Sequence, residues 1–224
     1  MIYFFLKRIV DLFLASIALL FLSPFLIITV LILLFTGEGE VFYLQERLGF
    51  KKKKFKIIKF ATMVKNSPNI GTGSLTLKND SRVLPFGKFL RKSKINELPQ
   101  IFNVILGNMS IVGPRPQMQV DFDKFPKKSL DLIYNSKPGI TGIGSIVFRD
   151  EETWISNYKG DKHEFYQKFI APYKADLELW YLNNSSIMVD FALIFITAWV
   201  ILFPKSDLVE KVFKNLPKRP SHLS

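Results

Sequence analysis

The chain is 224 residues long, has a formal net charge of +12 and contains no cysteine. This length suits one domain with a membrane segment, and 48% hydrophobic residues exclude a disordered or low-complexity chain. Without cysteine, disulfides, thiolate nucleophiles and cysteine-ligated metals are excluded, and two histidines are too few for a histidine cage. Any metal must therefore use carboxylates, which suit Mg²⁺. The positive charge predicts an anionic partner, which is nucleic acid, phospholipid head groups or phosphorylated metabolites.

The residues from Leu12 to Gly37 carry no charge and form the first candidate membrane segment. A helix rises about 1.5 Å per residue, so this run is long enough to cross a hydrocarbon core of about 30 Å. A cleaved signal peptide is the competing interpretation. The run is too long for the apolar part of such a peptide, and no small-x-small cleavage site precedes Glu38.

Two features of this segment bear on its topology. The proline of Ser23-Pro24 removes a helix hydrogen bond, which predicts a sharp bend. Basic residues lie before the segment, at Lys7 and Arg8, and after it, at Arg47 and 51–54. Because positive charge favours the cytoplasmic face, this favours a hairpin that enters and leaves through one leaflet. The residues alone leave a kinked through-span and a re-entrant hairpin open, and a two-span transporter or assembly subunit is a competing class.

A second apolar stretch runs from Ile187 to Phe203 and contains Asp190. It is marginal in length for a crossing, and Trp199 suits the depth of the head groups. We therefore predict a membrane-interface helix at 187–203, with a helix of the protein core as the alternative.

The segment from Glu40 to Met63 predicts a β-hairpin. Its β-prone and polar residues alternate on both sides of a turn that contains Gly49. Lys59 extends from the second strand, and the lysines at 51–54 suit a solvated face against anionic lipid.

The stretch "KINELPQIFNVILGN" from Lys94 to Asn108 predicts a helix. Apolar residues at 98, 101, 102 and 105 follow helical spacing, and Pro99 suits the first helical position. Asn96 and Glu97 then precede the helix, where free N–H groups stabilise a carboxylate or hold phosphate oxygens. Taken alone, this pattern predicts that Asn96 and Glu97 are helix caps.

Two further motifs point to anion binding. In "GPRP", Arg115 lies between two prolines, which stiffen the backbone that presents its guanidinium to a phosphate. In "KPGITGIGSIVFRDEE", Arg149 follows three glycines and precedes Asp150, Glu151 and Glu152. The glycines do not form a Walker motif, and the three acids are either a solvated run or part of a Mg²⁺ site.

Taken in order, these motifs resemble the bacterial sugar transferases, the small monotopic phosphoglycosyl transferases. The membrane helix with Ser23-Pro24, "FYLQERLG", "KIIKF", "GKFLRKSKINELPQIFNVILGNMSIVGPRP", "KPGITG" and the final helix with Asp190 follow the order and spacing of that family. The resemblance covers nearly all the chain. Six motifs in register are highly specific.

The resemblance implies an α+β, mainly helical fold. It implies a re-entrant membrane helix at 1–36 broken at Ser23-Pro24, a small β-hairpin, and a cytoplasmic catalytic domain at 37–224 with interfacial amphipathic helices. The protein would lie in the bacterial inner membrane with its catalytic domain on the cytoplasmic face. A homodimer is compatible with the family.

The resemblance also implies an enzyme that transfers a phospho-sugar from a UDP-sugar to undecaprenyl phosphate and releases UMP, as the first membrane step of surface glycan synthesis. It implies Mg²⁺, with Glu97 as a ligand. The phosphate-binding cations carried over by position are Lys59, Arg91, Arg115 and Arg149. The family's nucleophile is an aspartate that precedes this glutamate.

The sequence departs from the family at that aspartate, because position 96 is an asparagine and a neutral amide is a poor nucleophile. Three hypotheses follow. Glu97 is itself the nucleophile, with Mg²⁺ held partly by Asp150, Glu151 or Glu152; the lipid phosphate attacks directly while Glu97 holds the metal; or the chain is an inactive homologue that binds lipid phosphate or nucleotide sugar. A membrane-tethered nucleic-acid binder also explains the charge, but the sequence shows neither a helix-turn-helix nor interleaved basic and aromatic residues, so we expect no nucleic-acid partner.

Overall fold

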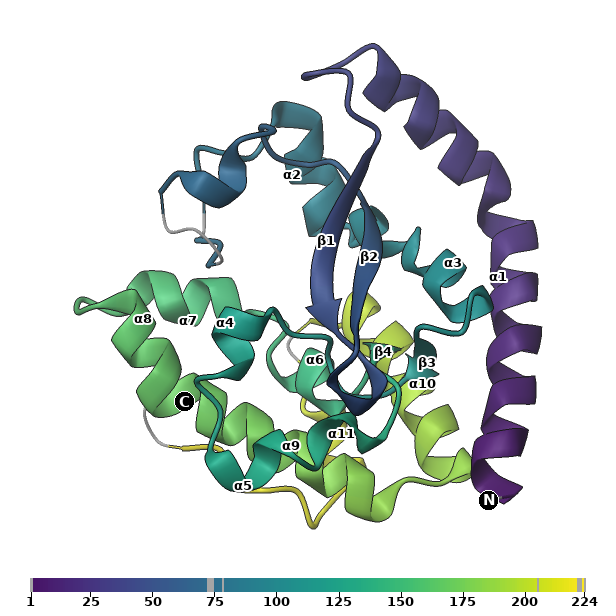
Figure 1. Cartoon of the computed structure of the whole chain (residues 1–224), viewed down its shortest axis with the longest axis vertical. Helices are drawn as coiled ribbons and strands as arrows, with labels where there is room; N and C mark the ends of the chain where they lie inside the picture. Colours follow the sequence, from purple (N-terminus) through teal and green to yellow (C-terminus); the bar gives the residue numbers. More distant parts are fainter. Residues whose placement is uncertain (1, 72–74, 78, 205, 221–222, 224) are drawn as a thin grey trace.

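The computed structural model describes residues 2–71, 75–77, 79–204, 206–220 and 223. Its α-helices are α1 (Ile2–Leu34), α2 (Pro85–Lys92), α3 (Gln100–Ile105), α4 (Gln119–Phe122), α5 (Lys127–Leu130), α6 (Ile143–Val147), α7 (Glu151–Asn157), α8 (Lys162–Phe165), α9 (Ala171–Asn184), α10 (Ile187–Leu202) and α11 (Leu208–Val212). The strands are β1 (Phe42–Leu48), β2 (Lys54–Phe60), β3 (Ser110–Val112) and β4 (Gly139–Thr141). The short helices are η1 (Phe50–Lys52), η2 (Ser67–Asn69), η3 (Ile95–Glu97), η4 (Ile133–Asn135) and the π-helix η5 (Tyr166–Ile170). The fold is mainly helical, as expected, and it has two small sheets, of which the hairpin alone was predicted (Figure 1).

Helix α1 continues through Ser23-Pro24, so the prediction that it is broken there is wrong. The N–H that Pro24 lacks would have bonded to the carbonyl of Leu20, four residues earlier. The Ser23 hydroxyl donates to that carbonyl at 3.0 Å instead. The helix therefore bends, as Figure 1 shows along its length, without ending.

One side of α1 packs on the rest of the chain along most of its length. Ala15 joins a buried cluster with Ile57 of β2 and residues of α3. Leu26 and Leu33 join a second cluster with Phe60 and Leu90. The remaining surface is strongly apolar, and its exposed side chains include Ile2, Phe4, Phe5, Ile9, Phe13, Leu20, Phe21, Phe25, Ile27, Ile28 and Leu31.

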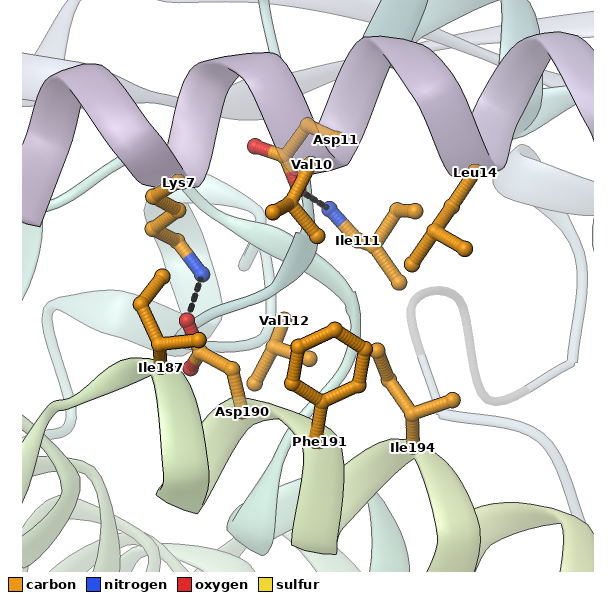
Figure 2. A pocket seen from close by; sticks show the side chains of 10 residues that line it. All are labelled: Lys7, Val10, Asp11, Leu14, Ile111, Val112, Ile187, Asp190, Phe191 and Ile194. Atoms are coloured by element: carbon orange, nitrogen blue, oxygen red, sulfur yellow. Dashed lines mark hydrogen bonds and ion pairs between the residues drawn. The ribbon is translucent and has the colours of Figure 1, made fainter.

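Charged residues in the first three turns of α1 fasten it to β3 and α10 (Figure 2). The Lys7 amine donates to the Asp190 carboxylate at 2.6 Å, and both side chains are buried. Asp11 accepts the N–H of Ile111 at 2.9 Å. The cavity at this junction measures only about 10 Å³, about the space of one water, so the junction is a structural contact and has no room for a larger ligand.

The predicted hairpin is confirmed as β1 and β2, which pair in antiparallel register with Tyr43 opposite Lys59. Residues two apart share a face of a strand, so Tyr43, Gln45 and Arg47 lie on the same face as Lys59. These three are half-buried, whereas the residues between them are exposed. The hairpin lies in the middle of the molecule (Figure 1).

The segments "SIVGPRP" and "KPGITG" meet as the short parallel pair β3 and β4, which the sequence did not predict. Glycines allow their close approach. A Cβ at Gly113 would lie 2.4 Å from the carbonyl oxygen of Lys137, and one at Gly142 would lie 2.3 Å from that of Gly113. These glycines therefore serve backbone packing, which is a more specific role than a loose glycine-rich turn.

The helix predicted at 187–203 is confirmed as α10, but it is apolar on both faces. Leu193, Ile196 and Val200 are buried in the main core, whereas Phe195 and Leu202 are exposed. It is therefore a core helix on one side and an exposed apolar surface on the other. This corrects the expectation of an amphipathic helix.

Candidate active site

Three charged side chains from separate elements meet beside the hairpin. Lys59 comes from β2, Glu97 ends η3, and Arg115 lies in the loop after β3. The Lys59 amine donates to Glu97 Oε1 at 2.8 Å, and an Arg115 nitrogen lies 3.6 Å from the same oxygen. The side chains of Lys59, Glu97 and Arg115 are 16%, 20% and 37% exposed, so this group is shielded but open to a ligand. We call Lys59, Glu97 and Arg115 the central cluster.

The central cluster keeps Glu97 ionised. Burial alone would raise the pKa of Glu97, but the positive charges of Lys59 and Arg115 outweigh it and hold that pKa well below its usual value. Burial lowers the pKa of Lys59 to about 8, with the charges of Arg115 and Arg47 acting in the same direction and that of Glu97 opposing them. Positive charge therefore exceeds negative charge around a single carboxylate, an arrangement suited to a phosphorylated ligand.

Lys94 extends this positive region, and an ion pair of Arg91 lies beside it. An Arg91 nitrogen lies 2.5 Å from Glu152 Oε1, so α2 and α7 are joined beside the cluster. Burial lowers the pKa of Lys94, which carries a positive φ of 61° between α2 and η3 and contributes positive charge at Glu97. Lys94 was not among the predicted site residues. Only its position before "INELPQ" could have suggested it.

The prediction that Asn96 and Glu97 cap a helix is wrong. Helix α3 is confirmed but starts at Gln100, and Asn96 and Glu97 belong to the separate turn η3. Neither η3 nor α3 has a side-chain cap bond at its N-terminal end within the described chain. The Glu97 carboxylate is bonded instead to Lys59 of β2. The Asn96 side chain is buried, and its Oδ1 has no hydrogen-bond partner among the described residues.

The acids at 150–152 do not gather around Glu97. Both carboxylate oxygens of Glu151 lie 2.7 Å from the Lys174 amine, and Glu152 pairs with Arg91. Asp150 occupies the position before α7 without a side-chain cap bond. Within the described part of the chain, no group of three His, Cys, Asp or Glu side chains could hold a metal ion.

Arg149 bonds to a residue outside the central cluster. Its guanidinium donates to the backbone carbonyl of Val200, near the end of α10. The structure thus brings Lys59, Glu97 and Arg115 together, whereas the described bond of Arg149 is to α10.

Arg47 is a site residue that the sequence reasoning missed. Its guanidinium donates to Gln45 and, at 3.4 Å, to the carbonyl of Pro116. Burial lowers the pKa of Arg47, and the charge of Arg115 adds to this effect. The signal was available in the hairpin register, which places Arg47 on the face that carries Lys59.

Comparison with known proteins gives one family. The family model described as "Bacterial sugar transferase" matches residues 2–204. The UDP-N-acetylgalactosamine-undecaprenyl-phosphate N-acetylgalactosaminephosphotransferase of Aeromonas hydrophila is 33% identical over 203 residues, which cover 90% of this chain and 44% of the relative. The UDP-glucose:undecaprenyl-phosphate glucose-1-phosphate transferase of Klebsiella pneumoniae is 34% identical over 204 residues, covering 89% of this chain and 41% of the relative. The exopolysaccharide production protein ExoY of Sinorhizobium fredii is 29% identical over 205 residues, covering 85% of this chain and 83% of the relative. The chain thus spans less than half the length of the first two relatives and most of the third.

Proposed function

Since this chain belongs to the bacterial sugar transferase family, we propose that it transfers a phospho-sugar from a UDP-sugar to undecaprenyl phosphate and releases UMP. The names of the Aeromonas and Klebsiella relatives describe this class of reaction with two different sugars. The proposal therefore extends to the class of UDP-sugars. The name of the Sinorhizobium relative supports a role in surface polysaccharide synthesis.

The observation that carries the proposal is the ionised Glu97 between Lys59 and Arg115. A nucleoside diphosphate sugar brings negative charge to this point, and charge-assisted hydrogen bonds from lysine and arginine hold phosphate oxygens. The same donors stabilise the charge that develops on the transferred phosphoryl group and on the departing UMP. The positive charge of Lys94 adds to this field.

We assign the covalent step to Glu97. In the first step a Glu97 carboxylate oxygen forms a bond to the β-phosphorus of the donor, and the bond from that phosphorus to the bridging oxygen breaks. The bonding electrons leave with UMP. In the second step a phosphate oxygen of undecaprenyl phosphate attacks the same phosphorus and frees Glu97. The neutral Asn96 amide cannot supply this carboxylate.

Direct transfer is the alternative route to the same products. Its support is that Glu97 Oε1 is already engaged by Lys59, which reduces its strength as a nucleophile. The lipid phosphate would then attack the donor in line, with no covalent intermediate on the enzyme.

Single-turnover experiments with the UDP-sugar and Mg²⁺ but no lipid separate the two routes. Stoichiometric UMP and a phospho-sugar adduct on Glu97 support the covalent route. UMP release that requires the lipid supports direct transfer. Absence of UMP with every UDP-sugar and with undecaprenyl phosphate present contradicts the proposed function.

Mg²⁺ is proposed as the cofactor, with Glu97 as its protein ligand. Proteins often bind Mg²⁺ through one or two carboxylates together with substrate phosphates. Glu97 is paired with Lys59 and Arg115 through Oε1, so its Oε2 is the atom that would hold the ion. When bound, the ion would neutralise charge on the diphosphate. Lys59 and Arg115 bind and orient that diphosphate from the protein side.

We further propose that α1 enters and leaves the bacterial inner membrane through the cytoplasmic leaflet. Helix α1 is long and apolar enough to cross a membrane by length and composition. Its first turns, its middle and its last turn all contact the same body, through Lys7, Ala15 and Leu33. If α1 crossed the membrane, one of its ends would lie on the opposite face and could not contact the catalytic domain. The exposed apolar surfaces of α1 and α10 are the proposed lipid contacts.

Single cysteines test this topology in a chain that has none. Ile2→Cys and Glu38→Cys lie at opposite ends of α1, and Lys128→Cys marks the catalytic domain. A reagent that does not cross the membrane should label all three variants from the cytoplasmic side. Labelling of Ile2→Cys from the other side would contradict the one-leaflet topology. The homodimer remains a prediction of the resemblance, and the mass of the detergent-solubilised particle checks it.

A further inference from the structure

Glu178 of α9 is a buried carboxyl that contacts the loop carrying Arg115. Glu178 is 3% exposed, and its Oε1 accepts a hydrogen bond from the backbone N–H of Arg115 at 3.1 Å. Burial raises the pKa of Glu178 to about 7, while that N–H and the charge of Lys174 act in the opposite direction. Burying a carboxyl costs free energy, so the contact of Glu178 with the loop needs a physical explanation.

The loop needs this contact because of its prolines. Pro114 and Pro116 have no backbone N–H, so Arg115 carries the one N–H of these three residues. Glu178 accepts that N–H, and the carbonyl of Arg115 accepts the Tyr134 hydroxyl at 3.0 Å. Both backbone groups of Arg115 are thus held by buried side chains from distant parts of the chain.

The surroundings of Glu178 are shaped to admit a carboxyl. A Cβ at Gly144 would lie 2.4 Å from Glu178 Oε1, so even alanine would collide with it. The other oxygen, Oε2, is buried without a hydrogen-bond partner among the described residues. An unpaired buried acceptor is unfavourable. The unpaired Oε2 therefore costs free energy, and the contact that accompanies this cost is the bond of Oε1 to the Arg115 backbone.

We infer that Glu178 is a positioning residue for Arg115. By fixing the Arg115 backbone, it sets the point from which the guanidinium reaches Glu97 and, if the proposed function holds, the diphosphate of the donor. The contact of Glu178 with this loop is to the Arg115 backbone N–H. Its effect on the reaction passes through Arg115.

The first test measures the backbone contact and does not depend on activity. Glu178→Gln keeps the size and an acceptor oxygen, whereas Glu178→Leu keeps the size and removes the acceptor. In the full-length protein in detergent, hydrogen exchange of the Arg115 amide should become about tenfold faster or more in Glu178→Leu. It should change little in Glu178→Gln. Unchanged exchange in Glu178→Leu would overturn the inference.

Gly144→Ala provides a second variant if Glu178→Leu does not fold. It leaves the carboxyl in place but forces Oε1 to move, since the added Cβ would lie 2.4 Å from it. Faster exchange of the Arg115 amide in Gly144→Ala supports the inference, and unchanged exchange contradicts it.

The second test is kinetic. Glu178→Leu should lower kcat/KM for the UDP-sugar by about a hundredfold, since displacement of a binding group by about 1 Å has this effect. Glu178→Gln should retain most of the wild-type kcat/KM. In an Arg115→Ala background, Glu178→Leu should have little further effect, because the two residues act as a unit. An equal loss in both backgrounds would contradict positioning through Arg115. If the wild-type protein releases no UMP, the proposed function fails, and amide exchange still decides whether Glu178 holds the loop.

Discussion

Replacing Lys7 tests whether the buried pair at the start of α1 holds that helix on the domain. Lys7→Met keeps the length of the side chain and removes its charge, leaving Asp190 buried. The two side chains are 8% and 7% exposed, and breaking such a pair costs about 3–5 kcal/mol. Asp190 keeps hydrogen bonds from the Tyr181 hydroxyl at 2.7 Å and the Tyr3 hydroxyl at 3.0 Å. We therefore expect a loss near the lower end, about 3 kcal/mol.

Lys52→Met is the matched control. Lys52 also lies 2.6 Å from its partner, Asp131, but these side chains are 44% and 83% exposed. An exposed pair contributes at most about 1 kcal/mol. The assay is the free energy of unfolding by denaturant in detergent, for the wild type and both variants. Equal losses in the two variants would refute the reasoning from burial, and Lys7→Met combined with Asp190→Leu should recover part of the loss.

Three other predictions concern the site. Lys59→Met should lower kcat by about a hundredfold through lost stabilisation of phosphoryl charge, whereas Lys56→Met, at an exposed residue of β2, should not. Steady-state UMP release checks both. Because burial raises the pKa of Glu178 to about 7 from its ordinary 4.5, the folded state keeps a proton that the unfolded chain loses, so wild-type stability falls as pH rises between these values. Glu178→Gln lacks this loss. The free energy of unfolding of Glu178→Gln minus that of the wild type should therefore be larger at pH 8 than at pH 4 by up to about 3 kcal/mol. The same difference at both pH values would contradict the assigned titration. Asn96→Asp puts a carboxylate at a buried position, and we expect a lower melting temperature together with stoichiometric UMP release without lipid. Fragmentation of the modified peptide should then place the adduct on residue 96, and an adduct on Glu97 alone would contradict this expectation.

The elements that depend on local pattern could be predicted from the sequence. Alternation of polar and apolar residues identified the hairpin, and helical spacing after Pro99 identified α3. The long apolar runs identified α1 and α10. The bend at Pro24 was expected, but continuation of the helix was not. A local hydrogen bond from Ser23 to the carbonyl that proline leaves free explains the difference.

The features that depend on distant contacts could not be predicted. The pair of β3 and β4 is only three residues long in each strand, and its glycines have meaning only once the two segments meet. Asn96 and Glu97 look like caps in the sequence because Lys59 is far away in the chain. Glu178 showed no signal, since its role depends on the position of Arg115. The "GPRP" motif suggested Arg115 and the family resemblance supplied Lys59 as site residues, and the contacts supply Arg47 and Lys94.

The most direct test of the proposed function compares UMP release by the wild type and by Glu97→Gln. Both proteins receive a UDP-sugar, Mg²⁺ and undecaprenyl phosphate, with Glu46→Gln as a control at an exposed acid of the hairpin. Glutamine keeps an acceptor for Lys59 but cannot supply an ionised carboxylate. We expect wild-type rates in Glu46→Gln and loss of turnover in Glu97→Gln, with folding preserved. An unchanged rate of UMP release in Glu97→Gln would contradict the assignment of the reaction to this carboxylate.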